Sequence, residues 1–237
     1  MSSEDRRAEL AARLAKVRAR IVAACEDAGR SRQEITLIAV TKTFPASDVA
    51  ALARLGVRDV GENRDQEAAL KAVAVAASGV DVRWHFVGQL QSNKCRSVAT
   101  YADMVHSVDR LSLVTALDKA AARRGRPLDV LVQACLDPDD GPKRGGLPVP
   151  ELPSLAAEVA ARDGLRLVGV MAVAPLGADP APAYRRLAEA SGRLRETYPE
   201  AAVVSAGMTG DFEIAIRHGA THLRIGSALL GGRPPLG

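Results

Sequence analysis

The alternation of short apolar runs with alanine-, leucine- and arginine-rich stretches is the feature that most constrains the fold of this chain. Eight runs have strand character, at residues 35–42, 57–63, 82–88, 104–109, 129–136, 165–173, 202–207 and 222–229. Helix-forming stretches lie between them, which is the pattern of βα units around a parallel sheet. Eight such units predict a closed (β/α)₈ TIM barrel in preference to an open doubly wound sheet.

An extra helix is expected before the barrel. Apolar residues recur at helical spacing between the serines at the N-terminus and Gly29, namely Leu10, Leu14, Val17, Ile21 and Cys25. We therefore expect an amphipathic leading helix within residues 1–30 and the barrel in residues 31–237. Because 47% of the 237 residues are hydrophobic, one core can serve the whole chain, and a single domain spanning 1–237 is predicted.

Composition argues against several classes of partner. No apolar stretch has the length of a membrane span, and the N-terminus is charged where a signal peptide would be apolar, so a cytoplasmic protein with no membrane partner is expected. The three cysteines are widely spaced and the histidines are not clustered, which indicates neither a disulfide framework nor a metal site. The net charge of +4 comes with 28 acidic residues and only 3% aromatic residues, a poor basis for binding nucleic acid.

Polar residues cluster at the ends of the predicted strands, where the active sites of such barrels lie. Lys42 ends an apolar run that begins at Ile35, and on an arbitrary strand it would be a solvent-exposed residue. Other strand ends also deliver polar or small residues, namely Asn63, His85, Ser205, Arg224, Gly226 and Ser227. Their common placement favours a binding site at the barrel mouth.

Two glycine-containing segments follow the seventh and eighth strands, "GMTGDFEIAI" and "RIGSALLGG". Many barrels bind a phosphate group here through backbone N–H groups. Glycines near helix starts also occur for purely structural reasons, but two such segments at these positions favour a phosphate site.

A lysine opposite a phosphate site suggests a carbonyl compound that carries a phosphate, since a desolvated lysine amine forms Schiff bases. Pyridoxal 5′-phosphate (PLP) and a sugar phosphate of an aldolase both fit this description. Arg224 shares a strand face with Gly226 and so points into the barrel. There it could keep a pyridine nitrogen unprotonated, or it could pair with a carboxylate on a neighbouring strand.

Six segments then match a known family in order and spacing: "AVTKTFP", "GENRDQE", "WHFVGQLQSNK", "GVMAV", "SAGMTGDFEIAI" and "RIGSALLGGR". On these motifs the chain resembles the pyridoxal phosphate homeostasis proteins, or YggS family. The resemblance implies a barrel similar to the alanine racemase N-terminal domain, a fold type III PLP protein. It also implies that PLP forms an internal aldimine with the lysine of the first motif, here Lys42.

The resemblance assigns further residues to the cofactor. Arg224 would face the pyridine nitrogen, and the phosphate would lie against Ser205, Gly226 and Ser227. Three motif residues would lie near the cofactor: Asn63, His85 and Met208. His85 could instead be a packed core histidine, and Lys94 of "QSNK" could be either a site residue or a solvated one.

The chain departs from the family pattern in two places. It has "SAGMT" where the family has "SMGMS", so Ala206 is expected to change the packing below the site while Thr209 keeps a hydroxyl. The Gly/Pro-rich segment 136–152 is expected to be a long βα loop that could serve as a lid, but it matches the family only through "KRG" at 143–145.

Binding of PLP does not by itself imply catalysis. Racemases with this barrel use acid/base groups on both faces of the substrate, one of them from an appended domain, and this sequence ends soon after its last strand. An arginine at the pyridine nitrogen also makes a poor electron sink. We therefore predict a monomeric, non-enzymatic PLP carrier that supplies apo PLP-dependent enzymes; a PLP-dependent racemase or decarboxylase is the alternative, and a Schiff-base aldolase acting on a phosphosugar is a third hypothesis.

Overall fold

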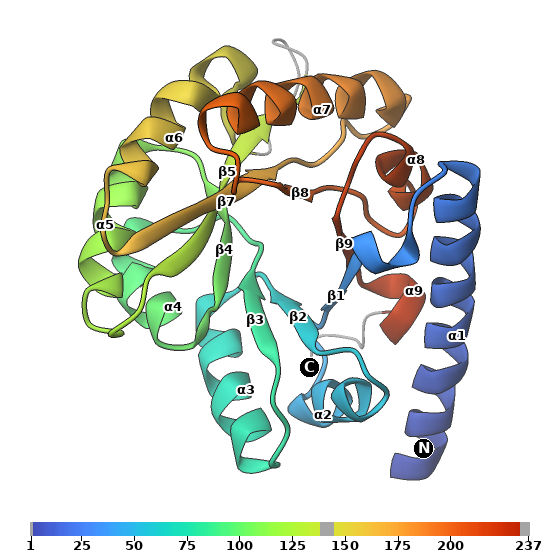
Figure 1. Cartoon of the computed structure of the whole chain (residues 1–237). Coiled ribbons are helices and arrows are strands. Elements are labelled where there is room, and N and C mark those ends of the chain that lie inside the picture. The colour runs from blue at the N-terminus through green and yellow to red at the C-terminus, as the bar shows by residue number, and fades with distance from the viewer. Residues whose placement is uncertain (1, 138–144, 233–237) are drawn as a thin grey trace.

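Eight parallel strands close into a barrel surrounded by helices (Figure 1). The computed structural model describes residues 2–137 and 145–232. The barrel strands are β1 Thr36–Val40, β2 Asp59–Glu62, β3 Arg83–Phe86, β4 Met104–Val108, β5 Leu128–Cys135, β7 Leu165–Met171, β8 Val203–Ser205 and β9 His222–Ile225. Their order around the barrel is β4-β3-β2-β1-β9-β8-β7-β5, and pairing of β4 with β5 closes the ring. Each strand overlaps one predicted run, so the (β/α)₈ prediction is confirmed.

A helix follows each barrel strand. The helices are α1 Ser3–Asp27, α2 Ala46–Arg54, α3 Asp65–Ala77, α4 Cys95–Tyr101, α5 Leu111–Ala121, α6 Leu152–Ala160, α7 Pro180–Thr197, α8 Phe212–Arg217 and α9 Ser227–Leu230. Short 3₁₀ segments are η1 Arg32–Glu34, η2 Ser92–Lys94 and η3 Val149–Glu151. Within the described part of the chain, every helix is too short or too polar to cross a lipid bilayer.

The leading helix α1 covers one side of the barrel wall and lies against α2, α8 and α9 (Figure 1). Ser2 and Asp5 form a capping box at its start, and Gly29, with φ 63°, follows its end. Its buried face consists of Leu10, Leu14, Val17, Ile21, Ala24 and Cys25. Burying each large aliphatic side chain stabilises the fold by about 1.5–3 kcal/mol, so the predicted amphipathic helix is an integral part of the core.

The segment after β5 contains a strand that the sequence did not predict. Strand β6, Leu147–Pro148, pairs with the end of β5. Gly146 precedes it with φ 103°, and a Cβ there would lie 2.6 Å from the carbonyl carbon of Ala134. The close approach of the chain to β5 therefore requires glycine at this position. Two residues are too short to show a strand periodicity, which is why the whole segment was expected to be a loop. Residues 138–144, including most of "KRG", lie outside the described residues, and the lid role stays a prediction.

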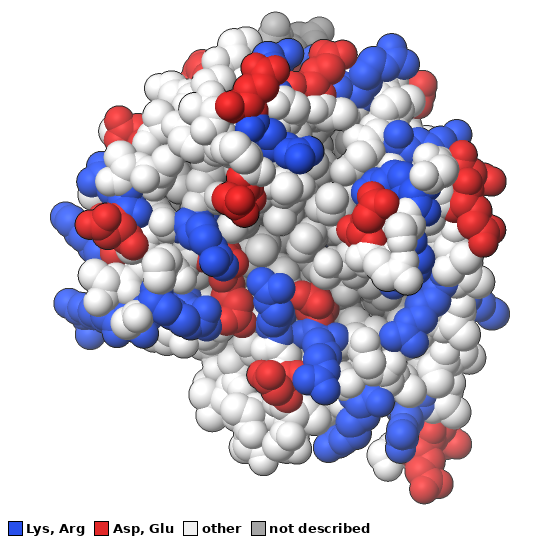
Figure 2. Space-filling view, in the orientation of Figure 1, with Lys and Arg blue, Asp and Glu red and all other residues white. Residues whose placement is uncertain are grey.

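The barrel interior combines a small apolar layer with buried polar residues. Met104, Leu131 and Met171 pack together inside it, while the larger apolar core lies between strands and helices. The outer surface seen in Figure 2 mixes acidic and basic side chains around a hollowed centre of mostly uncharged residues. The charge pattern on this face agrees with the scattered charges of the sequence.

Candidate functional site

A cavity of about 390 Å³ lies at the carboxyl ends of β1, β2, β8 and β9. Six of the eight predicted site residues line it: Lys42, Asn63, Met208, Arg224, Gly226 and Ser227. The remaining lining residues are Val40, Phe44, Val87, Val173, Thr209, Gly210, Gly231 and Gly232. The fold thus brings together residues that are up to 192 positions apart in the sequence, from Val40 to Gly232.

Lys42 follows β1 in a tight, strained turn. The N–H of Phe44 donates to the carbonyl of Thr41 across 3.0 Å, and Thr43 has φ 69°. Among the described residues, Thr43 is the only non-glycine with a positive φ, a conformation that costs about 1–2 kcal/mol for an ordinary residue. Lys42 itself is half-buried and lines the cavity, so it is not the fully exposed strand end that was the alternative interpretation.

Asn63 brings an unpartnered polar atom to the cavity. Its side-chain Oδ1 is buried and has no hydrogen-bond partner among the described residues. The chain after β3 packs directly on its backbone, because a Cβ on Gly88 would lie 2.2 Å from the carbonyl oxygen of Asn63. A buried acceptor without a donor costs about 1–3 kcal/mol, so this oxygen is suited to a ligand that donates a hydrogen bond.

Below the cavity, a line of hydrogen bonds crosses the barrel interior. Arg224 Nη1 donates to Ser205 Oγ at 2.6 Å, and this oxygen lies 2.9 Å from His106 Nδ1. His106 Nε2 lies 2.9 Å from His85 Nδ1, and His85 Nε2 lies 2.9 Å from Asp59 Oδ1. We call these five residues the histidine column. Arg224 also donates to the carbonyl of Ala172 at 2.7 Å.

The two ends of the histidine column have defined donors and acceptors. A guanidinium can only donate, so Ser205 Oγ accepts from Arg224 at one end. A carboxylate can only accept, so His85 Nε2 donates to Asp59 Oδ1 at the other end. The column therefore connects a buried guanidinium to a carboxylate.

Burial sets the protonation of this region. It lowers the pKa of His106 well below the ordinary value, and His85 and the Arg224 charge add to the effect. Burial also lowers the pKa of His222, whose ring packs beside His85, to about 4. Burial opposes ionisation of Asp59, yet the hydrogen bond from His85 and the nearby positive charges hold its pKa below the ordinary value. Burial lowers the pKa of Arg224 too, but a guanidinium stays protonated at neutral pH.

The structure places two predicted site residues beneath the cavity instead of along it. His85 and Ser205 are 1% and 0% exposed and belong to the histidine column. Their side chains point into the barrel interior below the strand ends, so they reach the cavity only through Arg224. His85 thus has the packed, hydrogen-bonded arrangement that was its alternative interpretation. His106 links His85 to Ser205. The sequence did not predict this role, because nothing in its local sequence distinguishes His106 from a core residue.

The segments that follow β8 and β9 form one wall of the Lys42 cavity, with the hydroxyls of Thr209 and Ser227 and the glycines Gly210 and Gly226. Ser227 Oγ donates to Thr209 Oγ1 at 3.3 Å, so the threonine that replaces the family serine keeps its hydroxyl at the site. Gly226 packs against β1, where a Cβ would lie 3.4 Å from the carbonyl oxygen of Val40. Ala206, the other departure from the family pattern, is 1% exposed and belongs to the apolar core.

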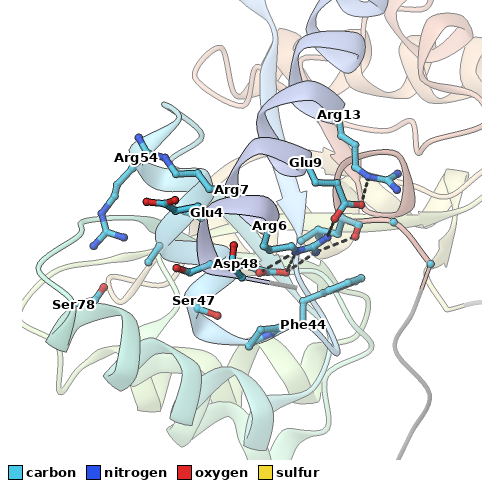
Figure 3. A pocket seen from close by; sticks show the side chains of 18 residues that line it. Glu4, Arg6, Arg7, Glu9, Arg13, Phe44, Ser47, Asp48, Arg54 and Ser78 are labelled. Atoms are coloured by element: carbon cyan, nitrogen blue, oxygen red, sulfur yellow. Dashed lines mark hydrogen bonds and ion pairs between the residues drawn. The ribbon is translucent and has the colours of Figure 1, made fainter.

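A larger cavity, of about 980 Å³, adjoins the Lys42 cavity (Figure 3). Its charged side chains largely neutralise one another: Arg6 pairs with Asp48 at 2.6 Å and with Glu9 at 2.8 Å. It meets the Lys42 cavity at Phe44 and at Gly231 and Gly232. We place the candidate site in the smaller cavity, because that one contains Lys42, Arg224 and the unpartnered Asn63 oxygen.

Lys94 does not line the Lys42 cavity. It ends η2 and lines an adjoining cavity of about 520 Å³, which shares Asn63 with the candidate site. Arg64 and Arg110 lie in the same adjoining cavity. Lys94 therefore lies next to the candidate site but does not line it.

Comparison with known proteins identifies the family of this chain. Residues 13–234 match the model of the alanine racemase N-terminal domain family. A pyridoxal phosphate homeostasis protein of Mycobacterium leprae is 46% identical over 243 residues, covering 96% of this chain and 94% of that protein. The chain belongs to the pyridoxal phosphate homeostasis protein family. The Escherichia coli K12 member is 41% identical over 235 residues, covering 95% and 97% of the two chains, and the predicted family resemblance is confirmed.

Solved structures share the barrel fold of this chain. PipY of Synechococcus elongatus has been solved with PLP bound; it is 30% identical, has a TM-score of 0.81, and the match covers 94% of this chain and all of that chain. Alanine racemase of Corynebacterium glutamicum has a TM-score of 0.68 at 15% identity, covering 93% of this chain and 62% of the racemase. The racemase likeness shows a shared barrel fold only.

Proposed function

We propose that this protein binds pyridoxal 5′-phosphate in the Lys42 cavity and serves PLP homeostasis. The proposal rests on one observation: a single cavity gathers a lysine amine, a guanidinium, an unpartnered amide oxygen and a pair of hydroxyls. These groups fit the parts of PLP, which carries an aldehyde, a pyridine nitrogen, a phenolic oxygen and a phosphate. The family names and the PLP-bound PipY structure support the same ligand.

Each group of the ligand has residues here that would hold it. PLP supplies an aldehyde that condenses reversibly with a primary amine and releases water. Lys42 presents such an amine, and Arg224 presents a donor that stays charged and would meet the pyridine nitrogen. Thr209, Gly226 and Ser227 would bind the phosphate, and Asn63 Oδ1 would accept from a donor on the ligand. Met208 would pack on the ring, while His85 and Ser205 would act through Arg224.

The composition of the cavity supports a carrier over an amino-acid racemase or decarboxylase. Among the described residues that line it, only Lys42 and Arg224 have titratable side chains. Racemisation needs a proton donor and acceptor on two faces of the substrate carbon, and Arg224 cannot exchange its proton near neutral pH. The names of the relatives, which refer to homeostasis, agree with a non-enzymatic role.

The proposal extends to a monomeric, cytoplasmic protein that passes PLP to apo PLP-dependent enzymes. Transfer is tested by mixing the loaded protein with an apo-enzyme and following recovery of that enzyme's activity against the same concentration of free PLP. Recovery that is no faster than with free PLP would argue for a buffering role. Steady turnover of an amino acid by the loaded protein, lost in Lys42→Ala, would support the racemase or decarboxylase instead.

The binding proposal is tested by titrating the purified protein with PLP and recording the visible absorption before and after borohydride. We expect a yellow band that reduction removes, with a pyridoxyl group on the peptide that contains Lys42. The conservative variant Lys42→Arg keeps the charge but has no primary amine, so it should lose the band. A parent protein that stays colourless and unmodified with added PLP would overturn the proposal.

A further inference from the structure

The strained turn at Lys42 is held in place by a buried charged cluster. Thr43 adopts φ 69° although it is β-branched, and such a conformation persists only where the surroundings enforce it. Three charged residues lie against this turn: Glu62, Glu67 and Lys71. We call them the Lys71 cluster.

Each neighbour of Lys42 in the chain is bound by the Lys71 cluster. Before the lysine, the Thr41 hydroxyl donates to Glu62 Oε1 at 2.6 Å, and the Thr41 carbonyl accepts from Lys71 Nζ at 2.9 Å. After it, the N–H of Thr43 donates to Glu67 Oε1 at 2.6 Å. The backbone on both sides of Lys42 is therefore anchored to the end of β2 and to α3.

Lys71 is the centre of the cluster. Its Nζ lies 2.6 Å from Glu62 and 2.9 Å from Glu67, so with the Thr41 carbonyl all three of its donors are used. The residue is 6% exposed and Glu62 is 0% exposed. Burial raises the pKa of Glu62, and the Lys71 ammonium opposes that shift. Buried charges of this kind are maintained only when they are paired.

We propose that Lys71, acting with Glu62 and Glu67, is a positioning residue that fixes the Lys42 amine for its reaction with the cofactor. The inference rests on the proposed function, in which Lys42 bonds PLP. Lysine has a flexible four-carbon stem, so the direction of its Cα–Cβ bond decides where the amine is found. The cluster holds that bond through Thr41 and Thr43, and a reacting group displaced by about 1 Å can lose about 100-fold in rate.

The test is the rate of covalent PLP binding, measured by stopped-flow absorbance together with the melting temperature of each apo-protein. Glu67 is the best residue to change, because its side chain is 28% exposed and the variants should fold. Glu67→Ala removes the acceptor for the Thr43 N–H, and we expect the rate to fall at least tenfold. Glu67→Gln keeps an oxygen acceptor, and its rate should stay within about threefold of the parent.

A matched control separates positioning from stability. Arg166 pairs with the buried Asp129 at 2.7 Å, near the starts of β7 and β5 at the opposite end of the barrel from Lys42. Arg166→Ala should lower the melting temperature without changing the rate of covalent binding. The rate of reaction with pyridoxal, which lacks the phosphate, should follow the same order as with PLP, because the effect concerns the amine and not the phosphate site.

A double-mutant cycle tests the role of the strained residue. Glycine adopts a positive φ without strain, so Thr43→Gly should make the turn less dependent on the cluster. In this background, Glu67→Ala should slow the reaction less than threefold. An equally large loss in both backgrounds would show that Glu67 does not act through the Thr43 backbone and would overturn that part of the inference.

The outcomes distinguish the two proposals. A parent that does not react with PLP at all would overturn the proposed function and the positioning role with it. A parent that reacts, with Glu67→Ala reacting equally fast at a lower melting temperature, would leave the proposed function standing. That result would make the Lys71 cluster a purely structural feature.

Discussion

The histidine column and the Lys71 cluster support the two ends of the same site by opposite means. The column holds the buried Arg224 through an uncharged acceptor, Ser205 Oγ, and the carboxylate at its far end, Asp59, is reached only through Ser205 and two histidines. The Lys71 cluster holds a strained backbone turn with direct ion pairs between buried charges.

This difference follows from what each region holds. A guanidinium needs acceptors, and neutral acceptors leave its charge available to a ligand in the cavity. A backbone turn with an unfavourable φ needs strong, short hydrogen bonds, and bonds to charged groups are about twice as strong as neutral ones. The charge of Arg224 thus stays available where the ligand would lie, whereas the charges of the Lys71 cluster are compensated by ion pairs where they hold the backbone.

The largest expected effect comes from removing the centre of the charged region. Lys71→Met should lower the free energy of unfolding by about 3–5 kcal/mol, because it leaves Glu62 buried without a counter-charge. The double variant Lys71→Met with Glu62→Leu should recover most of this loss, since a hydrophobic pair replaces the ion pair. Urea unfolding at neutral pH measures both, and a single variant that loses less than 1 kcal/mol would contradict the buried ion pair.

A smaller effect is expected from interrupting the histidine column. Ser205→Ala removes one of the two acceptors of Arg224 and the hydrogen-bond partner of His106 Nδ1, and we expect a loss of about 1–3 kcal/mol in unfolding free energy. PLP affinity should fall several-fold, because Arg224 loses its support. Ser107→Ala is the matched control: Ser107 is also buried, but its hydroxyl has no partner among the described residues. Equal behaviour of the two variants would count against the column.

The smallest effect concerns pH, and it has opposite signs for His222, which packs beside the histidine column, and for Glu62 of the Lys71 cluster. The pKa of His222 falls from 6.5 to about 4 on folding, so its stabilising contribution is complete above pH 6.5 and is lost as the pH falls toward 4. Between pH 7 and 5.5 this amounts to about 1 kcal/mol for this histidine. Glu62, whose pKa is raised, contributes in the opposite direction.

The pH effect can be assigned by substitution. The charged and titratable groups that face His222 are His85, Asp59 and Arg83, and they stay in place in His222→Gln. This variant should show a flatter fall in urea stability between pH 7 and 5.5 than the parent. An unchanged slope would mean that the pKa of His222 is the same in the folded and the unfolded protein.

The sequence by itself determined the architecture and the residues at the strand ends. Its alternation predicted every barrel strand, because periodic burial is a local property of consecutive residues. The same reasoning put Lys42, Asn63 and Arg224 at one end of the barrel, since parallel strands all finish there. It could not find β6, whose two residues carry no period.

Only the tertiary structure decided how these residues are supported. In the sequence, His106 looks like an ordinary strand residue and Lys71 like an ordinary helix residue. Each of them contacts a partner that the strand order and register of the closed barrel bring near. Ser205 and His85 lie beneath the cavity because their strands hold them deeper in the barrel interior than the residues that line it. Periodicity fixes which side of a strand a residue occupies, whereas the partner it meets across the barrel depends on the whole closed sheet.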